Sequence, residues 1–231
     1  VLIQENDFNE LQRLTEILNR AFLRIVQHYF SDERIRNIYQ LDKELEAILK
    51  LAAAYPYQVG MYRPDFVVDS RGQKKICEIG CRYPFNGWMF SYYVNEIVAK
   101  LVPVVNNNWS PVTGLDHFLD EYVQTLDVSQ PLFWVHDLEK GTEVNYLFHE
   151  LKQRNVLVES ISSGDLYAIG NNLFVEERPA QQFILEMDRE ELKRIDVSVL
   201  KALIASGNCP MHMMHSRQES CYHAQLKKRS T

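Results

Sequence analysis

An apolar run, a helical segment and a second apolar run follow one another between residues 131 and 160, and this succession constrains the fold most. The first run, PLFWVHD, ends in polar residues. It is followed by TEVNYLFHELKQRN, a helical pattern with Thr142 as its N-cap, and then by VLVES. Two strands joined through a helix form a β-α-β unit, in which the strands are parallel and the crossover is right-handed. The sequence therefore predicts an α/β fold.

The first third of the chain has the periodicity of helices. Apolar residues between Leu11 and Tyr29 recur at steps of three and four, and Asp42 is the expected N-cap of a second helix. At 61–81 the pattern changes to a predicted β-hairpin, MYRPDFVVD–SRGQ–KKICEIGCR, with Gly72 at positive φ in its turn. The stretch WMFSYYVNEIVAKLV then predicts another helix.

The rest of the chain predicts short elements and a division into three regions. DLYAIGNNLFVEE indicates a hairpin around the Asn-Asn pair at 171–172, and MDREELKRI and VSVLKALIA indicate two short helices, the second ending at Gly207. We expect residues 1–125 to hold the helical pair and the first hairpin. Residues 126–207 hold the β-α-β unit, and residues 208–231 form an irregular tail.

The composition is that of a globular protein, and it limits the cellular compartments and binding partners that we expect. The 231 residues are 46% hydrophobic and carry a formal charge of −6, which excludes a disordered chain and disfavours a broad nucleic-acid surface. No run of about 18 apolar residues is present, and four cysteines are too few for a disulfide scaffold. We therefore expect a cytoplasmic protein with neither nucleic-acid nor membrane partners, while its oligomeric state stays open. The chain starts at Val1 rather than Met, which indicates that residues upstream are missing.

Two acidic and two basic side chains give the first hairpin its chemical interest. Asp65 lies on one predicted strand and Glu78 on the next, where alternation places Glu78 on one face with Ile76. Two carboxylates on one face suit Mg²⁺, a hard cation that prefers oxygen ligands. Arg63 and Arg82 are placed to hold anionic oxygen. An exposed hairpin with balanced charges is the alternative interpretation.

These motifs resemble the circularly permuted ATP-grasp superfamily, in the branch that includes glutathionylspermidine synthase-like proteins. The resemblance covers residues 55–205 and rests on an R-x-D strand, a D-x-x-G turn and a K-I-x-E-I strand followed by a proline-containing loop. In that branch the metal-binding segment precedes a Rossmann-like pre-ATP-grasp domain, which is the order of the hairpin and the β-α-β unit here. The resemblance implies part of an ATP- and Mg-dependent carboxylate–amine ligase, with a small-molecule carboxylate and an amine as substrates.

The resemblance also assigns roles to individual residues. Asp65 and Glu78 match the magnesium-ligating carboxylates of the family, and Arg63 matches a catalytic arginine that faces the transferred phosphoryl group. Arg82 and Asn86 are the candidate cofactor-binding residues, Asn86 as a substitute for the asparagine that the family has two residues after its glutamate. Mg and ATP are the implied cofactors.

Two departures from the family leave other functions open. Gly80 stands where the family has that asparagine, and no glycine-rich loop or ATP-clamping lobe follows the β-α-β unit. This chain alone is therefore expected to be an incomplete or inactive ligase. One alternative is a non-catalytic binding module with a degenerate ATP-grasp fold. The other is a metal-dependent nuclease of the PD-(D/E)-x-K type, with Pro64-Asp65 and Glu78 as its acids but Gly80 in place of the catalytic lysine.

Three further groups of residues are weaker candidates for a functional site than the first hairpin is. His136 follows an apolar strand, at the end where open α/β sheets bind ligands, although a structural histidine is the simpler interpretation. Cys77 and Cys81 are expected to be packed thiols rather than a redox pair. The tail contains residue types that bind zinc, in a spacing that matches no closed tetrahedral site: Cys209, His212, His215, Cys221 and His223.

Overall fold

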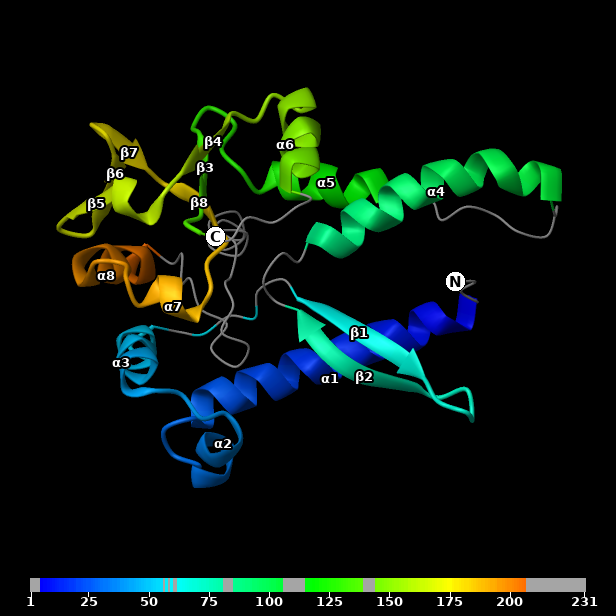
Figure 1. The fold of residues 1–231 in the computed structure, drawn as a ribbon, viewed down its shortest axis with the longest axis horizontal. Helices are drawn as coiled ribbons and strands as arrows, with labels where there is room; N and C mark the ends of the chain where they lie inside the picture. Colours follow the sequence, from blue (N-terminus) through cyan, green and yellow to red (C-terminus); the bar gives the residue numbers. More distant parts are fainter. Residues whose placement is uncertain are drawn as a thin grey trace.

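The computed structural model shows a mixed α/β fold, which confirms the predicted class (Figure 1). It describes residues 5–55, 57, 59, 62–80, 85–105, 115–138 and 144–206. The helices are α1 (Glu5–His28), α2 (Glu33–Ile38), α3 (Lys43–Ala52), α4 (Phe85–Val105), α5 (Leu115–Gln124), α6 (Val144–Gln153), the 3₁₀ turn η1 (Ser163–Asp165), α7 (Arg189–Leu192) and α8 (Val197–Ala205). The strands are β1 (Arg63–Val68), β2 (Lys74–Gly80), β3 (Leu132–Val135), β4 (Val158–Ile161), β5 (Leu166–Ile169), β6 (Asn172–Val175), β7 (Arg178–Ala180) and β8 (Gln182–Leu185).

Strand β3 is the central element, and all four of its residues are buried. It pairs in parallel with β4 on one side and with β8 on the other, so that the sheet order is β4-β3-β8. Because side chains alternate along a strand, Phe133 and Val135 point to one face of the sheet, and Leu132 and Trp134 point to the other. Each pair joins a separate hydrophobic cluster. The sheet therefore has a core on both faces, as parallel sheets usually do.

The face with Phe133 and Val135 is covered by an antiparallel sheet and three short helices. The sheet has the order β5-β6-β7, and the helices are α3, α7 and α8. Asp188 and Glu191 form a capping box that starts α7, and Asp196 caps α8. The fully buried side chains of these helices that belong to this hydrophobic cluster are Leu192, Ala202 and Leu203.

The opposite face of the parallel sheet is covered by α5 and α6, and α4 lies against these two helices (Figure 1). Trp88 of α4 packs on this cluster, and its ring stacks on Phe118 of α5 at a centroid distance of 6.0 Å. Figure 1 also shows α4 continuing well beyond α5 and α6. The fully buried side chains that α5 and α6 contribute are Leu119, Tyr122, Leu147 and Leu151.

The hairpin β1–β2 lies on α1 rather than on the parallel sheet (Figure 1). Just before β1, the Tyr62 ring packs edge-on against Phe22, with 4.9 Å between centroids. The Lys74 ammonium lies 2.5 Å from Asp7 Oδ1 and 2.7 Å from Glu10 Oε2. One face of the hairpin is thus fixed on α1 by a ring contact and two ion pairs.

Several local predictions are confirmed. Strands β3 and β4 are parallel and are joined through α6, as the apolar–helical–apolar succession predicts. The Asp42 carboxylate accepts the backbone N–H of Leu45 at 2.9 Å and so caps α3. Gly72 has a φ of +77° in the turn between β1 and β2.

Other details differ from the prediction, each for a local reason. The short helix α2 lies between the two helices expected in the first third, capped by Asp32. Gly170, with a φ of +61°, turns the chain between β5 and β6, because Asn172 already pairs with Ile169. Strand β8 was not predicted, since a fully buried run of four residues has no alternation to reveal it.

Some predictions fall on residues that the structure leaves undescribed. These are Thr142 as a cap, Gly207 as a helix stop and the tail at 208–231, with its candidate zinc ligands. The boundaries of the regions 1–125 and 126–207 stay predictions. In the described ranges, no helix combines the length and the apolar character that crossing a membrane requires.

Shortening a buried leucine of α6 should destabilise the fold far more than shortening an exposed one. Leu151 is fully buried, so we expect Leu151→Ala to lower the free energy of unfolding by about 2–5 kcal/mol. Leu157 is 54% exposed, and Leu157→Ala should cost less than about 1 kcal/mol. Urea unfolding followed by circular dichroism measures both. Equal losses would contradict the position of α6 over the sheet.

The carboxylate of Asp42 should give the fold a measurable acid sensitivity. Its hydrogen bond from the Leu45 N–H, together with Lys193 Nζ at 2.6 Å, lowers its pKa below the ordinary 3.8. A lowered folded-state pKa contributes stability above the unfolded pKa, and that contribution is lost as the pH falls through the folded one. We expect Asp42→Asn to have a lower thermal midpoint than the wild type at pH 7. The two midpoints should begin to converge as the pH falls below about 3.8, the ordinary pKa of an aspartate. A difference that stays constant with pH would contradict this role.

Candidate functional site

Three residues of the predicted site, the candidate catalytic Arg63 and the candidate metal ligands Asp65 and Glu78, lie together on one face of the β1–β2 hairpin. Asp65 is the cross-strand partner of Glu78, and Arg63 is the partner of Gly80. The Arg63 guanidinium donates from Nε to Asp65 Oδ1 at 2.8 Å and from Nη2 to Asp65 Oδ2 at 3.2 Å. Both oxygens of the Asp65 carboxylate are therefore engaged by an arginine two residues away on the same strand.

A β-bulge changes the predicted pattern of this hairpin. Cys77 has no partner in the register, because Asp65 pairs with Glu78 and Phe66 pairs with Ile76. The prediction that Ile76 shares a face with Glu78 is wrong, since Ile76 moves to the face of Phe66. Cys77 is a free thiol that donates to the Asp65 carbonyl oxygen at 3.3 Å. Its side chain is exposed, so the expectation of a packed thiol is wrong for this residue.

The side chains of the two candidate cofactor-binding residues, Arg82 and Asn86, are outside the described part of the structure. Arg82 lies outside the described residues, and so does Cys81. Asn86 is in the first turn of α4, but its side chain is outside the described part of the chain. Among the described residues, no group of three or more His, Cys, Asp or Glu side chains is arranged to hold a metal ion. The catalytic, cofactor-binding and metal roles assigned to these residues stay predictions.

A second polar cluster lies at the carboxyl end of β3, where His136 was a candidate. His136 is buried against Trp134, with 4.0 Å between ring centroids, and its Nε2 lies 2.7 Å from Ser160 Oγ on β4. Its Nδ1 is buried and has no hydrogen-bond partner in the structure. Trp134 Nε1 donates to the buried Glu186 carboxylate at 3.1 Å, directly after β8.

The loops that follow β3, β4 and β8 are tied to one another by carboxylates. Asp137 accepts from the backbone N–H and the hydroxyl of Ser163, at 2.8 and 2.7 Å. The buried Glu191 carboxylate accepts the N–H of Leu138 and that of Asp188, both at 2.7 Å. These groups satisfy one another, which favours a structural role for this edge. Sequence reasoning missed Glu186 and Glu191, although an acid directly after a buried apolar run was a usable signal for Glu186.

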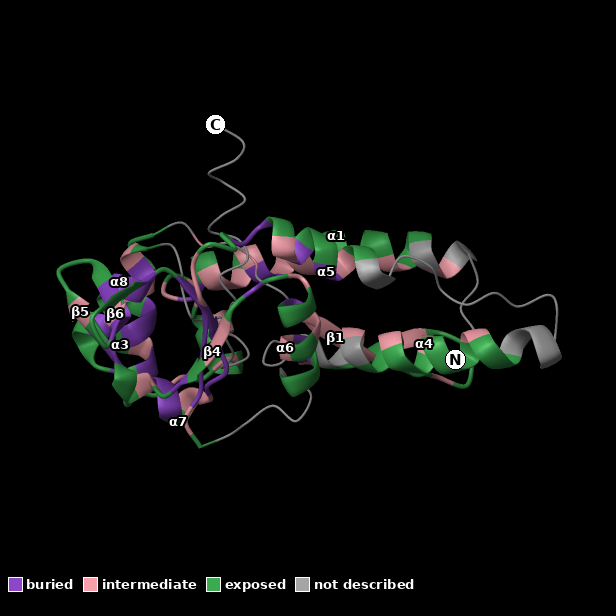
Figure 2. Cartoon of the chain, turned by 90° about the horizontal axis from the view of Figure 1, so that it is seen from above, coloured by how far each residue is buried: buried purple, intermediate pink, exposed green. Residues whose placement is uncertain are grey.

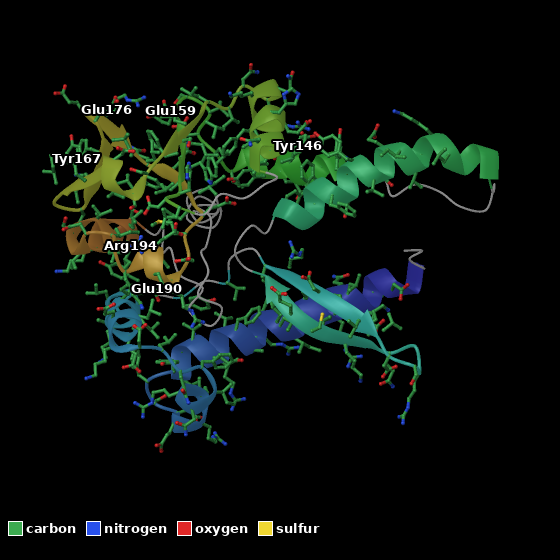
Figure 3. The ribbon with its side chains drawn as sticks, in the orientation of Figure 1. Tyr146, Glu159, Tyr167, Glu176, Glu190 and Arg194 are labelled. Atoms are coloured by element: carbon green, nitrogen blue, oxygen red, sulfur yellow. The ribbon has the colours of Figure 1, made fainter. Side chains whose placement is uncertain are left out.

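The most conspicuous surface feature is α4, which is apolar on two sides. The side of α4 that faces α5 and α6, called here the inner stripe, contains the half-buried residues Trp88, Tyr92 and Ala99. Tyr92 stacks on Trp88 with 5.3 Å between ring centroids. Tyr93 contacts Tyr146 at 5.4 Å, where α6 approaches α4 (Figure 3). Figure 2 shows α4 mainly in the colours of exposed and intermediate residues. The exposed apolar residues of α4, called here the outer stripe, are Phe90, Tyr93, Val94, Ile97, Val98 and Leu101.

An open hollow of about 460 Å³ lies near the junction of α1 and α2. Arg24 and His28 line it, beside an ion pair in which Arg34 Nη2 donates to Asp32 Oδ2 at 2.7 Å. This arginine and two backbone N–H groups lower the pKa of Asp32 to about 2. Its basic and acidic groups partly neutralise one another, so the hollow has no clear preference for one ligand charge.

Comparison with known protein families shows that residues 14–214 match the family model of the AnkG N-terminal domain. The chain belongs to the AnkG N-terminal domain family. The matched range runs from α1 to beyond α8 and includes the hairpin, α4 and the parallel sheet. Among curated proteins, no match is found.

Membership of the AnkG N-terminal domain family overturns the ATP-grasp interpretation. The resemblance to glutathionylspermidine synthase-like proteins was wrong, and so were the ligase, the degenerate ATP-grasp module and the nuclease that were inferred from the same hairpin. Its R-x-D strand instead carries a pair in which Arg63 binds Asp65 within β1. The resemblance rested on a short strand–turn–strand, whereas the AnkG N-terminal domain matches most of the chain.

Magnesium binding by the hairpin can be tested directly. We expect no saturable Mg²⁺ binding below about 1 mM, because both oxygens of Asp65 are engaged by Arg63, and Mg²⁺ gives up its bound water reluctantly for the few carboxylates of an exposed hairpin. Isothermal titration calorimetry of the wild type and of Glu78→Gln measures this. Saturable micromolar binding that Glu78→Gln abolishes would contradict the expectation and would support Asp65 and Glu78 as ligands.

Proposed function

We propose that this chain is a protein-binding domain and that the outer stripe of α4 is its binding surface. The observation that carries the proposal is the exposure of six apolar side chains on one side of a single helix. Phe90 is 67% exposed, Ile97 59% and Leu101 55%. Contiguous apolar patches of this kind are typical of protein-interaction sites, whereas single exposed apolar residues are normal on any surface.

The geometry of the helix explains why the outer stripe is a patch and not a scatter of residues. At about 100° per residue, Trp88, Tyr92 and Ala99 lie on one side of α4, toward α5 and α6. Phe90 and Ile97 project roughly 170–190° away from that side. A helix that is apolar all round is normally covered on all sides. In the described structure α5 and α6 cover the inner stripe, whereas the outer stripe stays exposed except at its edge, where Tyr93, 36% exposed, contacts Tyr146 of α6.

The size and the border of the outer stripe also suit a protein interface. At about 150–250 Å² for a large apolar side chain, its exposed fractions correspond to roughly 450–700 Å². A standard interface buries about 800 Å² on each partner. Glu96 and Lys100 are exposed and lie along one border of the stripe, and Ser91 lies along the other. An apolar centre with a polar rim is the usual arrangement of an interface.

A reducing compartment such as the cytoplasm is the location we propose for this domain. The support is Cys77, which carries an exposed free thiol in the hairpin. Exposed free thiols persist where glutathione and thioredoxin keep cysteines reduced. This proposal is independent of what the outer stripe binds.

A photo-reactive amino acid placed on the outer stripe should identify a bound protein. We expect benzoyl-phenylalanine at position 97 to form a defined crosslink to a protein in living cells, because Ile97 is at the centre of the stripe. Position 38 is the matched control, since Ile38 is also an exposed isoleucine of a helix, 73% exposed, but lies on α2. Adding Leu101→Ser should reduce crosslinking from position 97 at least tenfold. Equal crosslinking from positions 97 and 38 would contradict the proposal.

A further inference from the structure

We infer that the occupant of the outer stripe is a second copy of this chain, with the two α4 helices packed antiparallel about a twofold axis. The inference rests on the proposed function and adds the identity of the partner. It is carried by the spacing of the apolar residues, the placement of the charged residues and the area of the stripe.

The spacing of the outer stripe is that of a helix-pairing seam. Phe90, Val94, Ile97 and Leu101 follow one another at steps of four, three and four. This is the a/d repeat by which two helices interlock their side chains. Tyr93 and Val98 flank this seam, one on each side, and are also exposed. One helix of this type supplies half of a helix pair, and an identical helix supplies the other half.

An antiparallel register fills every layer of the seam with residues of complementary size. Phe90 of one copy meets Leu101 of the other, and Val94 meets Ile97, so that the four residues form four layers. A twofold axis between Asn95 and Glu96 repeats each contact, because a symmetric interface uses the same patch on both copies. No layer contains a charged side chain.

The charged residues favour the antiparallel orientation over the parallel one. In the antiparallel register, Lys100 of one copy lies beside Tyr93 of the other, where a cation meets an aromatic ring. The Tyr93 hydroxyl is 3.5 Å from Glu150 Oε1 of α6, so a carboxylate lies on the same side. In the parallel register, Tyr93 has Val98 of the other copy as its neighbour instead. Glu96 projects away from the seam in both registers.

The exposed area fits a reversible dimer. Two outer stripes of roughly 450–700 Å² bury roughly 900–1,400 Å² in total, which spans the range from transient to standard interfaces. We therefore expect a dissociation constant of about 1–100 μM. The monomer and the dimer are both populated at the concentrations of ordinary solution measurements.

Sedimentation velocity of the full chain between about 1 and 300 μM tests the dimer. The wild type should shift from monomer to dimer over this range, and Ile97→Ser should weaken association at least tenfold, since each substitution removes two contacts of a symmetric interface. Ile38→Ser is the matched control and should associate as the wild type does. Circular dichroism verifies that both variants are folded. A wild type that is monomeric at 300 μM, or equal weakening by both substitutions, would overturn the inference.

Cysteine crosslinking tests the orientation, in a chain whose four native cysteines are replaced by serine. Mixing Phe90→Cys chains with Leu101→Cys chains should give a disulfide-linked heterodimer under mild oxidation. Phe90→Cys alone should not crosslink, because antiparallel packing separates the two copies of this residue by about 16 Å along the helices. Efficient crosslinking of Phe90→Cys alone indicates parallel packing and overturns the antiparallel arrangement.

The failure of this inference can be told apart from failure of the proposed function. A monomeric chain whose position 97 still crosslinks to a different protein overturns the second copy as occupant and leaves the protein-binding function in place. A monomeric chain that gives no specific crosslink from position 97 overturns both. Binding of the monomer to phosphatidylcholine–phosphatidylserine vesicles, lost in Ile97→Ser, also overturns both, because the stripe then serves a lipid surface.

Discussion

The burial of β3 on both faces is the constraint on which the rest of this structure depends. Its alternating side chains point into two separate clusters, so the strand is stable only if two independent layers cover it. The layer over Phe133 is built late in the chain, from β5 to α8, together with α3. The layer over Trp134 is α5 and α6. Segments far apart in the sequence are thus held together by one four-residue strand.

The helix α4 belongs to the second layer only through part of its surface. Trp88, on which Tyr92 stacks, connects its first half to α5, and Figure 1 shows the helix extending beyond that contact. An isolated helix gains little from its own hydrogen bonds, so its stability depends on packing of its apolar residues. Only one side of α4 is packed in this way, whereas α8, which is also apolar almost throughout, has five buried residues among its nine. The two helices are therefore similarly apolar, but the rest of the fold covers much more of α8 than of α4.

The sequence carried enough information for the local structure but not for the bulge or the family. The strand–helix–strand order, the Asp42 cap and Gly72 in its turn depend on residues close together in the chain, and these predictions are confirmed. The bulge at Cys77 depends on pairing between two strands, which alternation alone does not reveal. Asp65 lies opposite Glu78 and pairs with Arg63, an arrangement that suits a structural hairpin, and the roles assigned to these residues stay predictions.

Averages over the whole chain conceal the outer stripe, because the chain is 46% hydrophobic and 24% charged, as ordinary globular proteins are. Periodicity did indicate a helix there, but both of its sides are apolar, and a single sequence does not say which side is covered by the rest of the fold. The structure resolves this, since α5 and α6, which cover the parallel sheet, contact the side of α4 with Trp88. Exposed apolar area favours association in proportion to its size. Because that area is concentrated on one face of a single helix, it favours a helical partner with the same repeat over a partner with a broad flat surface.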